Sequence, residues 1–545
     1  MTGAAAPSAL PKGAAPNGAA ASGAASTGGG GLLAIGGRRF AGFMAMVVGM
    51  FMAVLDIQIV SASIAEIQSG LAASPDEASW VQTSYLIAEI VMIPLSGFLS
   101  RMFSTRVLFT VSAVGFTVFS LACAFATSLP LMVLFRALQG FLGGAMIPTV
   151  FATSFLLFQG PTRVKASVLI GLTATMAPTI GPTLGGLLTD ALSWHWLFLI
   201  NVPVGAAIAL VVWTTLDIDR GDPSLARRFD WWGLGFMALF LGSLEYVMEE
   251  GPRWQWLDDG TVAAFAAVSA AACVAFFWRA FTSPQPIVEL RAYRDRNFAI
   301  GSLFAFILGI GLYGSVYLVP LFLGRVRGYD SLQIGQTMFI TGAGMFLASP
   351  LVGKLSAAVD PRALVACGLA GTGIALWLTA ELTNQSAFPE LWLPLVLRGA
   401  ATMFVMVPVT NIALGTLAPA VMKNASGLFN LMRNLGGAFG LAMINTMATD
   451  RSAAHRLHLS EAVASGRPAA AAAVGRMSDA LAARLGEGAD LAALARVRAM
   501  VQREALVLAY NDVLLVMAAL FLLAAPLVLL LSKPRAQAGP GGGGH

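Results

Sequence analysis

Two stretches decide how this sequence folds: LFRALQG at residues 134–140 and APTIGPTLGG at residues 177–186. Each lies in a long apolar segment, and a short basic link joins the two segments. A lone arginine inside such a segment is expensive in lipid, so Arg136 must face protein or water. Two prolines and three glycines within ten residues would break a soluble helix, but a membrane helix tolerates them where its neighbours or a cavity satisfy the freed carbonyl groups. The pair of segments indicates the moving part of a transporter.

The composition is that of a polytopic membrane protein. Of 545 residues, 57% are hydrophobic and only 11% are charged, whereas soluble domains carry about 25% charged residues. The basic residues lie in short loops between apolar runs, so the net charge of +5 does not indicate nucleic-acid binding. The sequence has no phosphate-binding loop motif and no cluster of histidines or cysteines with metal-ligand spacing. We therefore expect no catalytic residues, no metal site, no cofactor and no enzymatic activity.

Fourteen apolar runs are long enough to cross a bilayer core of about 30 Å, which takes about 20 helical residues. The sequence predicts an all-α polytopic membrane protein, and the even count places both termini on one side. Nineteen Lys and Arg residues lie in the loops and tails on that side, against three in the short loops opposite. The positive-inside rule then puts both termini in the cytoplasm. The expected spans are 40–63, 80–99, 106–126, 130–153, 166–188, 196–216, 230–249, 261–281, 298–323, 333–353, 362–382, 390–415, 426–448 and 510–532.

An internal repeat divides the chain. Residues 97–106 align without gaps on residues 353–362, and each stretch joins two apolar spans. Arg136 and Arg398 each lie a few residues into a span that starts outside. Two six-helix halves in parallel repeat explain both observations, with the seventh and eighth spans inserted between them. The expected divisions are a disordered cytoplasmic tail (1–37), the first half (38–216), two inserted helices with flanking loops (217–297), the second half (298–535) with a mostly helical periplasmic loop (449–509), and a Gly-rich tail (536–545).

These motifs carry a family resemblance. LFRALQG resembles the fourth-helix motif of the major facilitator superfamily, and APTIGPTLGG is similar to the fifth-helix antiporter motif of its exporters. Leu55-Asp56 followed by Ile59-Val60 resembles the first-helix motif of the fourteen-span drug:proton antiporters. Residues 194–205 are typical of the EmrB/QacA-type subgroup. The resemblance covers roughly residues 40–535 and implies the major facilitator fold, with spans 1, 4, 9 and 12 around a central cavity.

One stretch departs from the family pattern. In residues 97–106, Ser100 stands where the family has an acid and Ser104 where it has a second glycine. The departure argues against a salt-bridge latch built on that acid. Arg101 and Arg106 still contribute to the positive charge of an inner loop.

A proton-coupled exporter needs a carboxyl group that titrates inside a cavity, with a nearby cation to tune it. Asp56 matches the family's first-helix acid, and Glu89 lies about nine residues into the second span. Arg136 matches the fourth-helix arginine and is expected to pair with Asp56 or Glu89. We expect these three residues to couple proton binding to transport. The alternatives are a solvated acid at a helix end for Asp56, a structural ion pair for Glu89 and a hydrogen-bonding anchor for Arg136.

The antiporter-like segment is expected to act as a gate. Its prolines remove backbone donors and bend the helix, and its glycines are expected to allow close packing against the other half. The gating residues are Pro178, Gly181, Pro182, Gly185 and Gly186.

For the other charged residues within the spans, the sequence gives weaker indications of function. Arg398 and Arg433 are expected either to bind anionic substrates, to balance the acids, or to serve structure alone. Glu245 lies near the outer end of the seventh span and is expected to be an interfacial acid. His195, between two tryptophans, is expected to belong to an interfacial aromatic belt.

The sequence predicts an exporter of the bacterial cytoplasmic (inner) membrane that exchanges inward protons for outward hydrophobic or amphiphilic compounds by alternating access. The resemblance further implies a Gram-negative host, a periplasmic adaptor protein and an outer-membrane channel. One alternative is a dedicated exporter of a single metabolite, siderophore or toxic weak acid on the same fold. Another is a membrane scaffold or sensor that does not transport.

Overall fold

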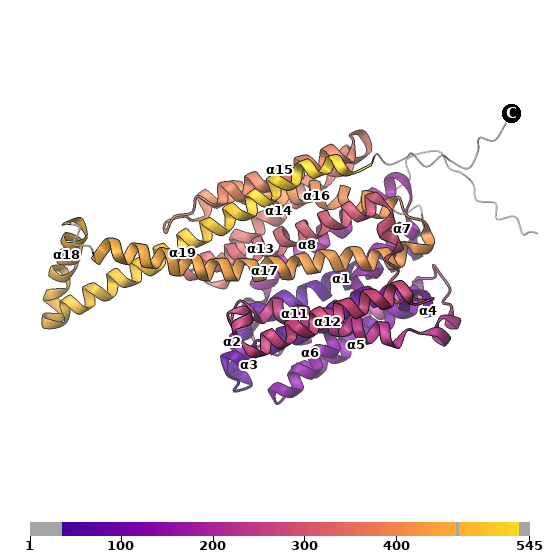
Figure 1. Ribbon diagram of the computed structural model, residues 1–545, viewed down its shortest axis with the longest axis horizontal. Coiled ribbons are helices and arrows are strands. Elements are labelled where there is room, and N and C mark those ends of the chain that lie inside the picture. The colour runs from indigo at the N-terminus through magenta and orange to yellow at the C-terminus, as the bar shows by residue number, and fades with distance from the viewer. Residues whose placement is uncertain (1–34, 465–467, 533–545) are drawn as a thin grey trace, which may run out of the picture.

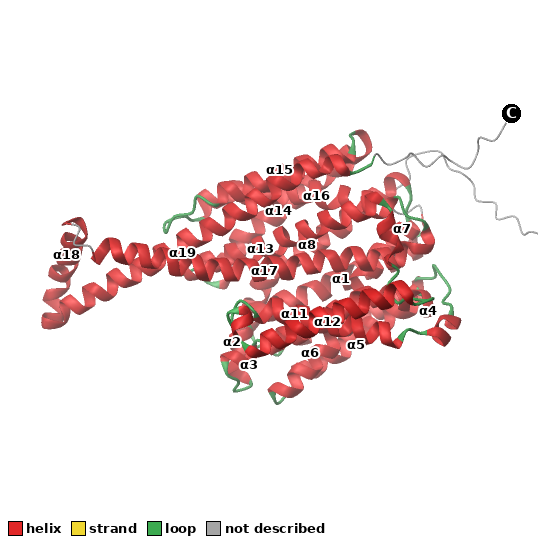
Figure 2. Cartoon of the chain, viewed as in Figure 1, coloured by secondary structure: helices red, strands yellow, loops and turns green. Residues whose placement is uncertain are grey.

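The computed structural model describes residues 35–464 and 468–532, and every regular element in these ranges is helical (Figure 2). Within them, thirteen helices are long and apolar enough to cross a membrane. One further helix, α17 (Pro419–Ala464), runs the length of the same bundle (Figure 1). It carries Asn430, Arg433 and Asn434 within its first sixteen residues. The prediction of an all-α chain with about fourteen spans is therefore confirmed. The N-terminal tail up to residue 34 and the C-terminal Gly-rich tail lie outside the described residues.

The first half consists of six spans, two of which are divided. The fourth span breaks at Gly143-Gly144, just before Pro148 in the first turn of the next helix, and the sixth breaks at Ile200. Two short helices, α2 (Ile64–Gly70) and α3 (Pro75–Ala78), link the first two spans. The helices are α1 (Gly37–Ala62), α4 (Trp80–Phe103), α5 (Thr105–Ala124), α6 (Leu129–Gly143), α7 (Met146–Leu157), α8 (Gly160–Ala191), α9 (Trp196–Leu199) and α10 (Asn201–Thr215).

The second half repeats the packing of the first. In the first half α1 packs on α8, α4 on α6, and α5 on both α6 and α10. The helices of the second half are α13 (Arg296–Arg325), α14 (Ser331–Ala358), α15 (Pro361–Thr379), α16 (Phe388–Gly415), α17, α18 (Pro468–Leu485), α19 (Ala489–Ala524) and η6 (Ala525–Leu530). Correspondingly, α13 packs on α17, α14 on α16, and α15 on both α16 and α19. The repeat in the sequence is thus matched by a repeat in the packing.

The two halves meet along two equivalent interfaces, α4 with α17 and α8 with α14. We call the end of the bundle where α1 begins and η6 ends the terminal end, and the opposite end the hairpin end. At the terminal end Gly97 touches α17 so closely that a Cβ atom there would lie 2.8 Å from the Asn424 Cα. At the hairpin end a Cβ on Gly335 of α14 would lie 1.7 Å from the Thr183 hydroxyl of α8. The interfaces are therefore tight at opposite ends.

The two inserted helices, α11 (Trp231–Glu250) and α12 (Gly260–Thr282), cover one of these interfaces. α11 packs against α12, α4 and α17, so it lies over the seam between the halves (Figure 1). At the terminal end Asp230 accepts from the Gly233 N–H at the start of α11 and pairs with Arg279 of α12 at 2.8 Å. Short 3-10 helices lie before, between and after the pair: η2 (Pro223–Arg228), η3 (Trp256–Asp258) and η4 (Leu290–Arg294).

Helices α17, α18 and α19 form a hairpin that projects from the bundle (Figure 1). The described part of residues 449–509 is helical, because α17 continues out of the bundle and α19 returns into it as the last span. His455 of α17 contacts Asp512 of α19 at 2.9 Å, and Asn511 donates to the Leu382 carbonyl at 2.9 Å. These contacts anchor the base of the hairpin to the second half.

Candidate functional site

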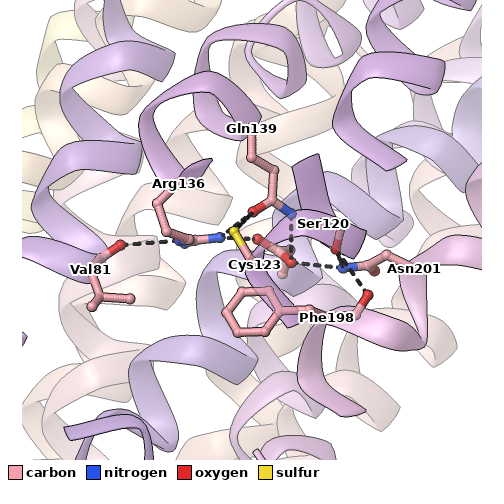
Figure 3. A network of polar contacts seen from close by, with 8 residues as sticks. Val81, Ser120, Cys123, Arg136, Gln139, Phe198 and Asn201 are labelled. Carbon is pink, nitrogen blue, oxygen red and sulfur yellow. Dashed lines mark hydrogen bonds and ion pairs between the residues drawn. The ribbon is translucent and has the colours of Figure 1, made fainter. Parts of the chain in front are cut away.

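A buried ion pair lies inside the first half. Asp56 and Arg136 are both fully buried, and Arg136 Nη1 lies 2.6 Å from Asp56 Oδ2. The other carboxylate oxygen of Asp56 accepts from Asn201 Nδ2 at 2.7 Å and from Gln139 Nε2 at 3.2 Å. Arg136 Nη1 also donates to Gln139 Oε1, and its Nε donates to the Val81 carbonyl at 3.1 Å (Figure 3). The network therefore joins α1, α4, α6 and α10.

Further contacts hold the arginine and its partners in place. The Arg136 guanidinium lies 4.2 Å from the Tyr85 ring centroid, a distance at which a cation is attracted to the ring face. Asn201 also donates to Ser120, which in turn donates to the Phe198 carbonyl (Figure 3). Within the described residues, Arg136 Nη2 has no hydrogen-bond partner.

This arrangement can act as a proton-controlled switch. Each charge of a buried pair depends on the other, because removing one partner leaves an uncompensated charge in a medium of low polarity. A proton added to Asp56 would cancel its attraction for Arg136 and free that arginine to seek other partners. Since four helices meet at the pair, such a change would alter their mutual packing.

Glu89 lies outside this network. It is buried in the middle of α4 and lines a cavity of about 70 Å³ bounded by α1, α4, α11, α13 and α17. Neither Asp56 nor Arg136 makes a hydrogen bond or ion pair with it, and no other described residue does so. Glu89 is therefore not the structural partner of an arginine in this conformation. Of the spans expected to surround a central cavity, the first and ninth line this one, while the fourth and twelfth do not.

The expectation for Glu245 was wrong. Its side chain is only 5% exposed, and it lines the same cavity as Glu89, together with Glu249. The reason is the position of α11, which turns this face toward the seam between the halves. The sequence held a signal for this arrangement, because acids four residues apart share one face of a helix.

The antiporter-like segment packs differently from the expectation. Pro178 and Pro182 lie inside a continuous α8, and Gly181 and Gly185 face α1 of the same half. A Cβ on Gly181 would lie 2.4 Å from the Gln58 Cβ, and one on Gly185 would lie 2.8 Å from the Ile59 carbonyl oxygen. The other half is met instead by Thr179 and Thr183, on a different face of the helix.

The two intramembrane arginines of the second half have different surroundings. Arg398 is buried in α16 and donates to the Ser315 carbonyl at 3.2 Å and to the Thr341 hydroxyl at 3.0 Å. It is the repeat-mate of Arg136, but its hydrogen bonds go to neutral groups. Arg433 is buried in α17 with its guanidinium 5.5 Å from the Phe151 ring. Its Nε and Nη1 have no hydrogen-bond partner within the described ranges.

A polar cross-link closes the α4–α17 interface at the terminal end. Lys423 of α17 pairs with Asp219 and donates to the Ser100 carbonyl at 2.8 Å. The departure of residues 97–106 from the family motif is thus compensated, since Ser100 contributes its main-chain oxygen and Asp219 supplies the acid from another loop. Sequence reasoning missed Asp219, because no local pattern links it to Lys423.

A second set of contacts lies beside the first. Arg101 of α4 pairs with Glu289, whose carbonyl accepts from Asn424 Nδ2 of α17 at 2.8 Å. The Glu289 N–H in turn donates to Asn424 Oδ1 at 3.2 Å. We call the contacts of Ser100, Arg101, Asp219, Glu289, Lys423 and Asn424 the terminal latch. It joins both halves to the loop that follows the inserted helices.

Comparisons with known proteins agree with this fold and site. Residues 46–441 match the family model of the Major Facilitator Superfamily. The chain is 43% identical over 421 residues to the colistin resistance protein EmrB of Acinetobacter baumannii, covering 77% of this chain and 82% of that relative. It is 30% identical over 509 residues to the multidrug export protein EmrB of Escherichia coli, covering 92% and 97%. The solved structure of the proton:xylose symporter XylE aligns with a TM-score of 0.57 at 12% identity, covering 90% of this chain and 95% of that one.

These features define a multi-pass membrane transporter rather than an enzyme. The chain belongs to the major facilitator superfamily, and its relatives are exporters of the EmrB type. The resemblance stated from the sequence motifs is confirmed. The described residues hold no group of three or more metal-ligating side chains.

Proposed function

We propose that this protein is a proton-coupled antiporter that exports hydrophobic and amphiphilic compounds across the bacterial cytoplasmic membrane by alternating access. The buried Asp56–Arg136 pair carries the proposal, because it is a titratable carboxylate held by a single cation where four helices meet. Intramembrane ionisable groups of this kind are costly and are usually functional. The names of the relatives, which include multidrug export and colistin resistance, support export as the direction.

In this account protonation of Asp56 releases Arg136 and permits the halves to rock against each other. The terminal latch opens in one state and closes in the other, and α8 slides along α1 through the Pro178–Gly186 segment. The gating group comprises Pro178, Gly181, Pro182, Gly185 and Gly186. Glu89 is a second proton-binding group on the cavity side, Arg433 partly balances the charge of Glu89, and Arg398 holds α13, α14 and α16 together. The moving halves are residues 38–216 and 298–535, with 217–297 inserted.

The orientation follows from the distribution of basic residues. Both termini are placed in the cytoplasm by the positive-inside rule, which puts the hairpin in the periplasm. The hairpin carries a groove of about 1110 Å³ between α17, α18 and α19, with Arg456 and Arg498 beside Leu457 and Leu494. We infer that a periplasmic adaptor protein leading to an outer-membrane channel contacts this projecting hairpin.

Dye efflux from proteoliposomes with an imposed pH gradient tests the proposal. Wild-type protein should transport lipophilic dyes only when the gradient is present. Asp56→Asn should bind dye but lose gradient-driven transport, and Glu89→Gln should transport at a reduced rate. The matched control is Glu66→Gln, which removes an exposed carboxylate at the hairpin end.

A panel of a dozen lipophilic dyes and drugs separates the alternatives. Gradient-driven transport of several chemical classes supports a multidrug exporter. Transport of one class alone favours a pump dedicated to a single metabolite, siderophore or toxic weak acid. A chain that moves none of the compounds under any gradient contradicts the proposal and favours a scaffold or sensor.

A further inference from the structure

The cavity beside Glu89 gathers three carboxyl groups from two parts of the chain. Glu89 comes from the first half, while Glu245 and Glu249 come from the inserted helix α11. α13 and α17 of the second half close the opposite wall with Tyr313 and Asn434. The cavity therefore lies where both halves and the insertion meet, at a place that changes shape whenever the halves move.

These carboxyl groups have little positive charge to balance them. Arg433 and Arg136 are the cations that act electrostatically on Glu89, and Arg136 is already paired with Asp56. The charged groups that act on Glu245 are Glu249 and Glu89, both acidic. The described residues provide no ion pair to any of the three cavity acids. The α11 side of the cavity is thus an uncompensated acidic surface.

Hydrogen-bond acceptors in the cavity wall also lack donors. Glu245 Oε2, Gln82 Oε1 and Asn434 Oδ1 are buried without a hydrogen-bond partner in the described part of the chain. All three residues line the cavity, and Glu245 is more than nine-tenths buried. Leaving such buried acceptors unpaired is unfavourable, because they lose the hydrogen bonds that water would give them. A ligand that carries both positive charge and N–H donors would satisfy them together.

We propose that this cavity binds the cationic head group, a primary ammonium or a guanidinium, of an amphiphilic compound that the protein transports. A volume of about 70 Å³ holds a few water-sized groups, since one water needs about 10–15 Å³. The site therefore accommodates a head group, and Leu86, Ile90 and Leu441 contribute apolar surface to its wall for the carbon atoms next to the charge. Under this proposal α11 is part of the binding site and not only a cover of the seam. The inference rests on the proposed function only in treating the ligand as transported.

Binding to the purified full-length protein in lipid nanodiscs tests the inference without any gradient. The probe is dansylcadaverine, a fluorescent primary amine, and its N-acetylated form is the uncharged control. Wild type should bind the amine with a Kd at least tenfold below that of the acetylated form. Glu245→Gln should weaken amine binding about tenfold and leave binding of the acetylated form within twofold. Glu66→Gln, which removes an exposed carboxylate of α2 that does not line the cavity, should change neither.

A second variant protects the test against a folding defect. Glu249→Gln removes the partly exposed acid of the same wall and should weaken amine binding in the same direction, with thermal melting confirming the fold of each variant. Equal affinity of wild type for the two probes, or unchanged amine binding in both variants, would overturn the inference. Failure of gradient-driven efflux with intact, Glu245-dependent amine binding would contradict the antiporter proposal alone.

Discussion

At the scale of single residues, the first half is organised around one buried carboxylate whose two oxygens both accept hydrogen bonds. Asp56 accepts from Arg136, Gln139 and Asn201, and all four residues are buried. Hydrogen bonds to charged groups contribute about 1.5–3 kcal/mol each, so the network stabilises one arrangement of its four helices. The same dependence makes the network sensitive to the loss of either charge.

We predict that the two charges are strongly coupled in stability. Arg136→Leu leaves Asp56 buried without its cation and should lower the free energy of unfolding by about 3–5 kcal/mol. The double variant Asp56→Asn/Arg136→Leu should lose clearly less than Arg136→Leu alone, since no unpaired charge remains. The measurement is SDS-induced unfolding in mixed micelles. Additive losses would show that the two side chains do not act as a pair.

Sequence motifs pointed to the pair but not to its full surroundings. The motifs identified Asp56 and Arg136. Their contact could also be predicted, because a buried charge needs a partner of opposite charge. Gln139 lies inside the quoted LFRALQG stretch and Asn201 inside residues 194–205. Both are polar residues within apolar spans, and this property could have identified them as candidate members of the site. Which polar residues meet depends on helix rotation, and that is set by packing across the whole half.

At the scale of helices, close contacts determine which helix surfaces can move past each other and which are held together. Gly181 and Gly185 of α8 place it against α1, and the terminal latch ties α4 to α17. The hydropathy pattern predicted the bounds of the first twelve spans to within several residues, because length and apolarity are local properties. The last two differ more, since α17 and α19 run on beyond the expected spans. The hydropathy pattern did not predict that α11 would cover the seam between the halves, because hydropathy does not determine which helices pack against each other.

The contact between α8 and α1 should tolerate no added methyl group at Gly185. A Cβ there would lie 2.8 Å from a backbone oxygen, so Gly185→Ala should destabilise the protein by about 1–3 kcal/mol. Gly171 of the same helix is the matched control, because its nearest atom would lie at 3.6 Å, an ordinary contact. Thermal unfolding of the two variants measures the difference. Equal melting temperatures would contradict the packing described for α8.

The terminal latch should control access at the terminal end of the bundle. Lys423→Gln removes the ion pair with Asp219, and partly exposed pairs contribute about 0.2–1 kcal/mol. Labelling of a cysteine placed at Ser100 by a membrane-impermeant maleimide, in a background without native cysteines, should then become up to about fivefold faster. Lys354→Gln, in the stretch 353–362 that aligns with residues 97–106, should leave the rate unchanged. A rate unaffected by Lys423→Gln would mean that the latch does not restrain opening.

At the scale of the whole molecule, two half-bundles with the same packing pattern meet at two interfaces that are tight at opposite ends. The internal repeat in the sequence predicted the two halves, because a duplicated pattern of spans folds into a duplicated set of contacts. The cavity between Glu89 and α11 was not predicted, since it depends on three parts of the chain that only the tertiary fold brings together. The buried carboxyl groups proposed to act in transport thus lie at two places, one inside a half and one between the halves.

Proton release on substrate binding tests the central claim of antiport most directly. Purified protein is mixed with a transported dye in weakly buffered solution, and the released protons are counted with a pH indicator. Wild type should release protons in proportion to the dye bound, and Asp56→Asn should bind dye with a smaller release. A wild-type protein that binds dye without releasing any proton, over the whole pH range in which it stays folded, would contradict proton-coupled export.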